Sequence, residues 1–211
     1  MLIGITLSAF AYFLGSISFS ILIAKMFGVT DIRKHGSGNA GSTNVLRVAG
    51  KKAAALTFIC DFLKGVVPVV AAHFICPEYN FQFVLISAFM SIIGHIFPAY
   101  FNFKGGKGVA TSFGAVIAMS VLTNKLWIPL ALFGVWLIVV IITRYVSLGS
   151  VIVFALYPVL VGFFFANMSP VYYFSYLFFA VLVGALGIFM HRKNIKRLLR
   201  GRESKIGQKV K

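Results

Sequence analysis

Long apolar segments alternate with short polar ones along the chain. A transmembrane helix needs about 20 predominantly apolar residues, and six segments approach or reach that length: 2–24, 53–75, 81–101, 126–143, 148–166 and 171–190. A seventh apolar segment, 108–122, is shorter, so its length alone allows either a span or a re-entrant segment. The pattern predicts an all-α polytopic membrane protein with little room for a soluble domain.

The distribution of Lys and Arg decides between six and seven crossings. These residues favour the cytoplasmic side of a membrane. They are dense in residues 25–52 and in the segment after Met190, whereas the loops at 76–80 and 167–170 have none. If 108–122 crosses the membrane, both basic regions face the cytoplasm and both uncharged loops face outside. Seven crossings therefore fit the charge distribution better than six.

The resulting topology has seven transmembrane helices, an outside N-terminus and a cytoplasmic C-terminus. Residues 1–191 form one integral membrane domain, and residues 192–211 form a basic cytoplasmic tail that we expect to be mobile towards Lys211. Lys125 is the basic residue that this arrangement leaves on the outside.

Composition narrows the choice of partners. The 211 residues are 60% hydrophobic and 11% charged, against about 25% charged in soluble domains. The net charge is +16, but the basic residues lie between and after apolar segments, which favours anionic lipid and phosphate ligands over nucleic acid. Only four residues are acidic. No carboxylate cluster is therefore available for a metal, and we expect neither a metal nor a cofactor.

Two glycine-rich, cationic loops carry the strongest functional signal. The first is 36–47, in which glycines alternate with Ser, Thr and Asn before Arg47, and the second is 103–111, which contains Lys104 and Lys107 and leads into an apolar helix. Glycine lets backbone N–H groups converge on a ligand, and such groups beside cations and a helix N-terminus bind phosphate. Neither loop has the spacing of an NTPase, and the dinucleotide fingerprint in the first follows a helix rather than a strand.

Other polar residues stand out within or beside the apolar segments. Asp61 and Lys64 can pair across one helical turn, and charges at that depth usually face the protein interior, so we interpret Asp61 as structural. His95 is either a proton carrier or an interfacial histidine. His191 and Asn194 lie one turn apart where the last span ends, and Ser147 follows Arg144 at another interface.

Taken together, these residues resemble a known family. The chain is similar to the bacterial acyl-phosphate-dependent glycerol-3-phosphate acyltransferases, integral membrane enzymes of phospholipid synthesis. The resemblance runs through essentially the whole chain and rests on these segments, in this order: 11–16, 36–47, 61–65, 94–98, 103–111, 144–147 and 191–194. It implies transfer of an acyl group from acyl phosphate to glycerol-3-phosphate, giving 1-acyl-glycerol-3-phosphate (lysophosphatidic acid) and phosphate, in the bacterial inner membrane with a cytoplasmic active site.

The resemblance also implies roles for individual residues. Arg47 and Lys107 neutralise phosphate charge, and the base that takes the hydroxyl proton is either His191 or a substrate phosphate. Ser147 and Asn194 help His191 to hold glycerol-3-phosphate. The remaining substrate-binding residues lie in the two glycine loops: Ser37, Gly38, Asn39, Thr43, Asn44, Gly105 and Gly106. The expected partners are the two substrates, membrane lipid and a soluble enzyme that produces acyl phosphate.

A competing interpretation is a transporter or channel for phosphate-type anions. Glycine loops and positive charge suit that class too, but a permeation path needs cations at several depths, and here Lys64 alone is deep in an apolar segment. A non-catalytic membrane scaffold is a third interpretation, and it gives no reason for two loops dense in Gly, Asn and Lys.

Overall fold

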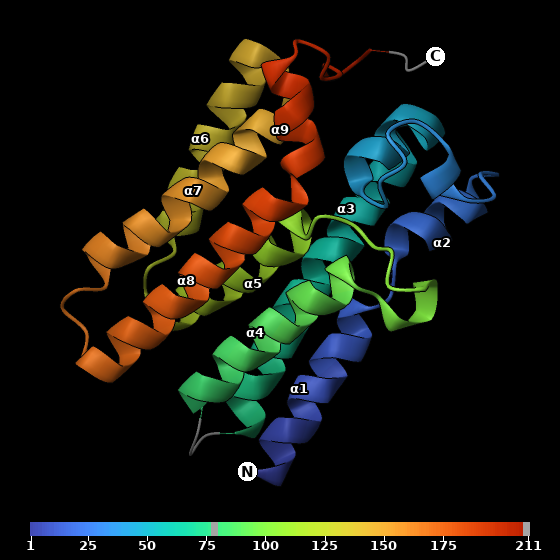
Figure 1. Ribbon diagram of the computed structural model, residues 1–211. Helices are drawn as coiled ribbons and strands as arrows, with labels where there is room; N and C mark the ends of the chain where they lie inside the picture. Colours follow the sequence, from blue (N-terminus) through green and yellow to red (C-terminus); the bar gives the residue numbers. More distant parts are fainter. Residues whose placement is uncertain (77–79, 209–211) are drawn as a thin grey trace. The chain divides into compact units, whose positions relative to one another are not determined.

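The computed structural model describes residues 1–76 and 80–208, which form helices and loops without a strand (Figure 1). The prediction of an all-α protein is confirmed for this part of the chain. Short 3₁₀ turns cover Ile32–Lys34 and Ala99–Phe101. The α-helices are α1 (Leu2–Gly15), α2 (Phe19–Met26), α3 (Ser42–Ile75), α4 (Asn80–Ile96), α5 (Val109–Leu122), α6 (Trp127–Thr143), α7 (Val146–Phe164), α8 (Pro170–Met190) and α9 (Arg192–Leu199).

Among the described residues, five helical segments are long and apolar enough to cross a membrane: Leu2–Met26, Ser42–Ile75, Phe81–Phe101, Val146–Phe164 and Pro170–Met190. The apolar helices α5 and α6 are shorter. The chain is thus a multi-pass membrane protein, while the count of seven spans and the orientation of the termini stay predictions. The expected outer loop at 76–80 falls largely on residues 77–79, outside the described residues, and the expected mobile end of the tail, 209–211, also lies outside them.

The first apolar segment is not one continuous helix, contrary to the prediction over 2–24. It breaks after Gly15 into α1 and α2. The break falls where serines alternate with apolar residues. There the Ser16 hydroxyl donates to the Tyr12 carbonyl, and the Ile17 carbonyl accepts a hydrogen bond from Lys64 Nζ. A broken helix is tolerated at membrane depth where protein groups satisfy its backbone.

Helix α3 begins well before the predicted start at residue 53. Its first turns, from Ser42, already belong to the first glycine loop, and the backbone of Gly50 then leaves the helical conformation at φ 86°. A left-handed φ of this kind suits glycine, which has no Cβ to clash. The kink separates a short helix that ends the loop from the long apolar part of α3.

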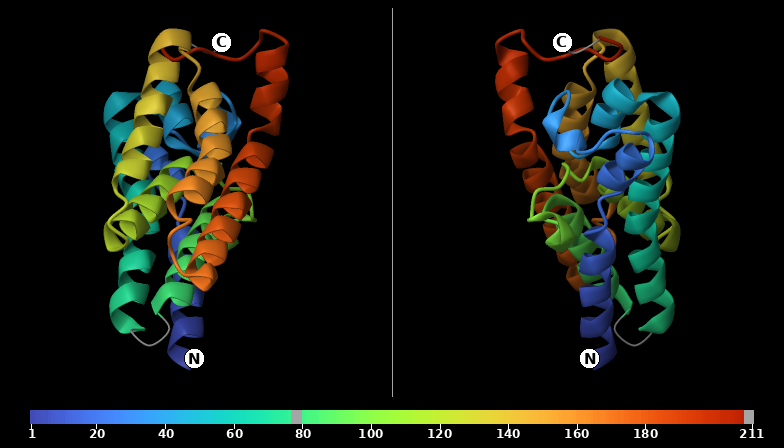
Figure 2. Two further views of the ribbon diagram at one scale, coloured as in Figure 1. Left: turned by 90° about the vertical axis from the view of Figure 1, so that its left-hand side faces the viewer. Right: turned by 90° about the vertical axis from the view of Figure 1, so that its right-hand side faces the viewer.

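The chain divides into two compact units, and the first covers residues 1–119. Within it α1, α3 and α4 lie side by side in both Figure 1 and Figure 2. Glycines bring the helices close together: a Cβ on Gly15 would collide with the Ser91 carbonyl, and one on Gly65 with the Thr111 carbonyl of α5. Small residues at such contacts are typical of membrane helices.

The second unit covers residues 120–208. In it α7 packs between α6 and α8, and α9 follows α8 directly. After α9 the chain turns back to the junction of α6 and α7, where Ile206 N donates to the Arg144 carbonyl (Figure 2). The predicted basic tail therefore begins with a helix and a docked segment.

Candidate functional site

Asn44 holds the first glycine loop in shape. Its side-chain Oδ1 accepts a hydrogen bond from Ser37 N at 2.8 Å, and its Nδ2 donates to the carbonyls of Ile32 and His35 at 3.1 and 3.0 Å. The side chain is buried. One amide thus satisfies three backbone groups between the 3₁₀ turn at Ile32 and Ser37 of the loop.

This geometry bears on the predicted phosphate cradle. Gly36 and Gly38 have φ of 60° and 71°, which glycine adopts readily, so the loop has the tight backbone that the sequence indicates. The Ser37 amide is engaged by Asn44, and the Gly38 amide donates to the His35 carbonyl. Asn44 therefore acts as a scaffold of the loop. A direct role in binding stays a prediction for Asn44 itself and for Ser37, Gly38, Asn39 and Thr43.

An ion pair that the sequence did not predict connects the segment before this loop to the segment before the second one. The Arg33 side chain lies 3.0 Å from the Asp31 carboxylate and donates a further hydrogen bond to the Phe101 carbonyl at 3.2 Å. The hydrogen bond from Arg33 holds the pKa of Asp31 below its usual value. Phe101 ends the 3₁₀ turn just before the second loop, so the pair links two segments that are far apart in sequence.

The second glycine loop packs tightly against the end of α4. The amides of Gly105 and Gly106 donate to the carbonyls of Ile96 and His95. A Cβ on Gly106 would collide with the His95 ring and with the Ala40 carbonyl of the first loop. Glycine is required here by close approach, and the same approach places the two loops against each other.

Both loops run into helix N-termini close to this contact. Helix α3 begins two residues after Ala40, and α5 begins three residues after Gly106. Backbone N–H groups at a helix N-terminus favour anions. Arg47 lies in the first turns of α3 and Lys107 just before α5, and both are partly buried. The first unit therefore presents two helix N-termini and two cations around joined glycine loops.

The predicted pairing of Asp61 with Lys64 is confirmed. Lys64 Nζ lies 2.8 Å from Asp61 Oδ1, and both side chains are almost fully buried. His95, left open between two interpretations, is buried beside the same carboxylate, with Nδ1 at 3.6 Å from Oδ1.

In the second unit, Ser147 and Asn194 converge on a carboxylate that the sequence analysis gave no role. Glu203 Oε1 accepts hydrogen bonds from Ser147 Oγ at 2.7 Å and Asn194 Nδ2 at 2.6 Å, and Oε2 accepts one from Arg197 Nε at 2.6 Å. The structure thus brings Ser147 and Asn194 together, with Glu203 between them, and their role in holding glycerol-3-phosphate stays a prediction. One feature of the sequence could have pointed to Glu203, because an acidic residue is rare in so basic a segment.

The Glu203 carboxylate is held in its charged form. Burial raises its pKa, but the hydrogen bonds from Arg197, Asn194 and Ser147 outweigh burial and keep the pKa below its usual value. Hydrogen bonds to a charged acceptor are stronger than those to a neutral one. These donors come from α7 and α9, so one carboxylate joins the tail segment to two helices.

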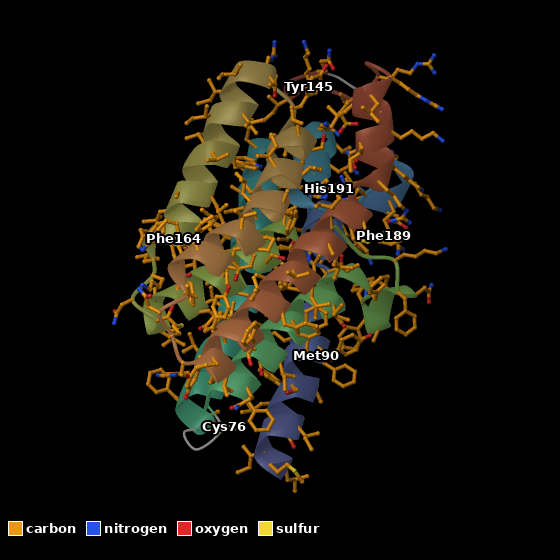
Figure 3. The ribbon with its side chains drawn as sticks, turned by 60° about the vertical axis from the view of Figure 1, so that its left-hand side comes forward. Cys76, Met90, Tyr145, Phe164, Phe189 and His191 are labelled. Carbon is orange, nitrogen blue, oxygen red and sulfur yellow. The ribbon has the colours of Figure 1, made fainter. Side chains whose placement is uncertain are left out.

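His191 lies where α8 ends and α9 begins (Figure 3). It is buried, and its Nδ1 lies 2.7 Å from the Gly187 carbonyl. Because a carbonyl only accepts, Nδ1 carries the proton in the neutral ring, and the lone pair is then on Nε2. The ring also packs against Phe154. These contacts fix the ring at the junction of the two helices.

Among residues 1–76 and 80–208, no three acidic, histidine or cysteine side chains lie close enough together to hold a metal ion.

Comparison with known proteins places the chain in a family. The sequence profile described as glycerol-3-phosphate acyltransferase matches residues 5–201. The chain belongs to the glycerol-3-phosphate acyltransferase family. It is therefore an acyltransferase of lipid biosynthesis, and this finding favours the enzyme over the anion transporter.

Individual relatives of the acyltransferase match over nearly their full length. The glycerol-3-phosphate acyltransferase of Thioalkalivibrio sulfidiphilus is 41% identical, with 100% of this chain and 98% of the relative covered. That of Clostridioides difficile is 44% identical, with 97% and 96% covered. A crystal structure of PlsY (YgiH), an integral membrane glycerol 3-phosphate acyltransferase in its glycerol 3-phosphate form, is 42% identical with a TM-score of 0.84, covering 97% of this chain and 96% of that one.

Proposed function

We propose that this acyltransferase takes its acyl group from acyl phosphate and transfers it to glycerol-3-phosphate, giving lysophosphatidic acid and inorganic phosphate. The observation that carries this proposal is the pair of joined glycine loops, with Gly106 against the Ala40 carbonyl and a cation at each following helix. Such loops suit a compact phosphate. The crystal structures of PlsY in glycerol 3-phosphate and lysophosphatidic acid forms support the acceptor and the product.

The chemistry of acyl phosphate suits the residues present. The glycerol hydroxyl oxygen attacks the acyl carbonyl carbon, the bond from that carbon to the phosphate oxygen breaks, and phosphate leaves with the bonding electrons. Because phosphate is a good leaving group, no covalent enzyme intermediate is needed. Orientation of the substrates and neutralisation of their charge then supply most of the rate.

Each group of residues has a part in this reaction. Arg47 and Lys107 neutralise phosphate charge, and the two glycine loops, including Gly105 and Gly106, bring the N-termini of α3 and α5 to the phosphate. Ser147, His191 and Asn194 hold glycerol-3-phosphate. The hydroxyl proton passes either to His191, whose Nδ1 contact with Gly187 leaves the lone pair on Nε2, or to a substrate phosphate.

We infer a seven-span topology in the bacterial inner membrane with the active site on the cytoplasmic side. The distribution of Lys and Arg supports this orientation, and acyl phosphate made by a soluble enzyme would reach the site from that side. The acyl chain would extend among the apolar helices.

A comparison of acyl donors tests the proposal. Purified protein is given glycerol-3-phosphate with either palmitoyl phosphate or palmitoyl-CoA, and the products are identified by mass spectrometry. We expect lysophosphatidic acid from palmitoyl phosphate at a rate at least about tenfold higher. A thioester has no phosphate next to the reacting carbonyl, so it lacks the contact with the loop cations, and a hydrogen bond to a charged group contributes about 1.5–3 kcal/mol. Comparable rates from the two donors would refute the donor assignment.

A further inference from the structure

A series of buried polar contacts connects the break between α1 and α2 with the second glycine loop. At its centre Asp61 and Lys64 are 2% and 3% exposed. Neither has a part in the proposed reaction. A buried ion pair is weak evidence for stability, because desolvation offsets much of the attraction, and ionisable residues at membrane depth usually serve a function. The pair therefore calls for a specific explanation.

The contacts of Lys64 account for its own position. Its Nζ donates to the Ile17 carbonyl at 2.7 Å and lies 5.6 Å from the centre of the Phe19 ring. Ile17 lies in the break, where backbone carbonyls lose their helical partners. Lys64 thus closes the break, and Asp61 balances its charge. The charge of Lys64 explains why an acidic residue lies near it. It does not explain why that residue, Asp61, also lies beside His95.

His95 connects that acid to the loop. One edge of its ring, at Nδ1, faces Asp61 Oδ1 at 3.6 Å, and this buried nitrogen has no hydrogen bond within the described residues. The other edge, at Nε2, lies so close to Gly106 that a Cβ there would collide with it. The His95 carbonyl also accepts the Gly106 amide at 3.2 Å. The imidazole therefore stands between the Asp61 carboxylate and the backbone next to Lys107.

We propose that Asp61, acting through His95, is a positioning residue that sets the place of Lys107 in the second glycine loop. The inference rests on the role proposed above for Lys107. Rotation of the imidazole away from Asp61 would shift Gly106, and the cation of the next residue would shift with it. A displacement of about 1 Å in a positioned group can reduce a rate about 100-fold. Lys64 contributes indirectly, because its ion pair holds the carboxylate in place.

Two variants without the buried charges test the link. Asp61→Asn combined with Lys64→Met keeps an oxygen facing His95 Nδ1, and Asp61→Leu combined with Lys64→Met does not. Both lose the Lys64 contacts equally, and neither leaves an unpaired buried charge. Their difference therefore isolates the contact with His95. His95→Leu also removes the contact between His95 and Asp61. Because it leaves both Asp61 and Lys64 unchanged, it tests the link with the ion pair still present.

The measurements are the melting temperature and the steady-state constants for both substrates, with wild type and Lys107→Arg in the same assay. Lys107→Arg keeps the charge but moves it, so the substrate whose KM it raises is the one that this loop binds. We expect two variants, Asp61→Leu/Lys64→Met and His95→Leu, to raise the KM for this substrate. The KM should be at least about fivefold higher than in Asp61→Asn/Lys64→Met. The KM for the other substrate and the melting temperature should change little.

The outcomes separate the possibilities. A lower kcat with both KM values unchanged and a lower melting temperature would mean fewer folded molecules and would overturn the inference, as would equal constants in the Asn and Leu variants. No turnover by wild type would instead refute the proposed function. Ser91→Ala is the matched control, because Ser91 is a buried residue one turn before His95 whose hydroxyl bonds within its own helix. It should resemble wild type in every constant.

Discussion

At the scale of single residues, the cations of the two glycine loops are the most direct test of the anion site. Lys107 and Arg47 are partly buried, whereas Lys104 is exposed three residues before Lys107. A hydrogen bond to a charged group contributes about 1.5–3 kcal/mol. We therefore expect Lys107→Ala and Arg47→Ala each to lose at least about tenfold in turnover, and Lys104→Ala to lose much less. Steady-state rates of purified variants with normal membrane insertion measure this, and near-normal turnover of Lys107→Ala would remove it from the reaction.

Asn44 and Asn39 provide a second residue-scale prediction. Asn44→Ala strands three backbone groups, and a buried unsatisfied group costs about 1–3 kcal/mol. We expect this variant to lose both melting temperature and activity. Asn39→Ala, which changes a predicted substrate contact, should lose activity alone. Thermal unfolding in detergent and turnover are measured together, and an unchanged melting temperature for Asn44→Ala would contradict its scaffold role.

The sequence predicted which residues belong to the candidate site better than it predicted the contacts that each of them makes. Glycine, asparagine and cation spacing indicated both loops, and the i, i+3 spacing of Asp61 and Lys64 predicted their pairing. The sequence could not show that Asn44 faces into its own loop or that Glu203 reaches Ser147, because those contacts join positions 7 to 56 residues apart. They depend on how the chain folds back on itself.

At the scale of helices, hydropathy located the apolar segments but not the interruptions within them. The break after Gly15 and the kink at Gly50 depend on hydrogen bonds and backbone angles that a hydropathy pattern does not encode. The tail shows the same limit, since its charge predicted a basic juxtamembrane segment but could not show that the Glu203 contacts and the Ile206 amide hold α9 and residues 203–206.

A pH-dependent prediction concerns this docked tail. Because the pKa of Glu203 is lowered in the folded protein, its stabilising contribution is present above the unfolded pKa of about 4.3. That contribution is lost as the pH falls through the still lower folded pKa. Wild type should therefore melt above Glu203→Gln at neutral pH, and the difference should shrink as the pH falls from about 6 to about 3. A difference that stays constant over this range would contradict the account of the carboxylate.

At the scale of the whole molecule, family membership supports both the enzyme class and a multi-pass membrane protein. The seven-span topology is a separate prediction, and cysteine labelling tests it. Single cysteines are introduced in a background lacking Cys60 and Cys76. A cysteine at Ser169 should react with an impermeant thiol reagent in intact cells, and one at Lys51 should react only after permeabilisation. The charge distribution is the physical reason. Labelling at Lys51 in intact cells would overturn the seven-span arrangement.

The central claim is that acyl phosphate and glycerol-3-phosphate react on this protein without a metal. The most direct measurement follows phosphate release from palmitoyl phosphate by purified protein, with and without glycerol-3-phosphate and with and without EDTA, together with lysophosphatidic acid formed. We predict release that depends on glycerol-3-phosphate, yields one phosphate for each lysophosphatidic acid, and is unchanged by EDTA. Release that is independent of glycerol-3-phosphate, or that EDTA abolishes and added Mg²⁺ restores, would contradict the account.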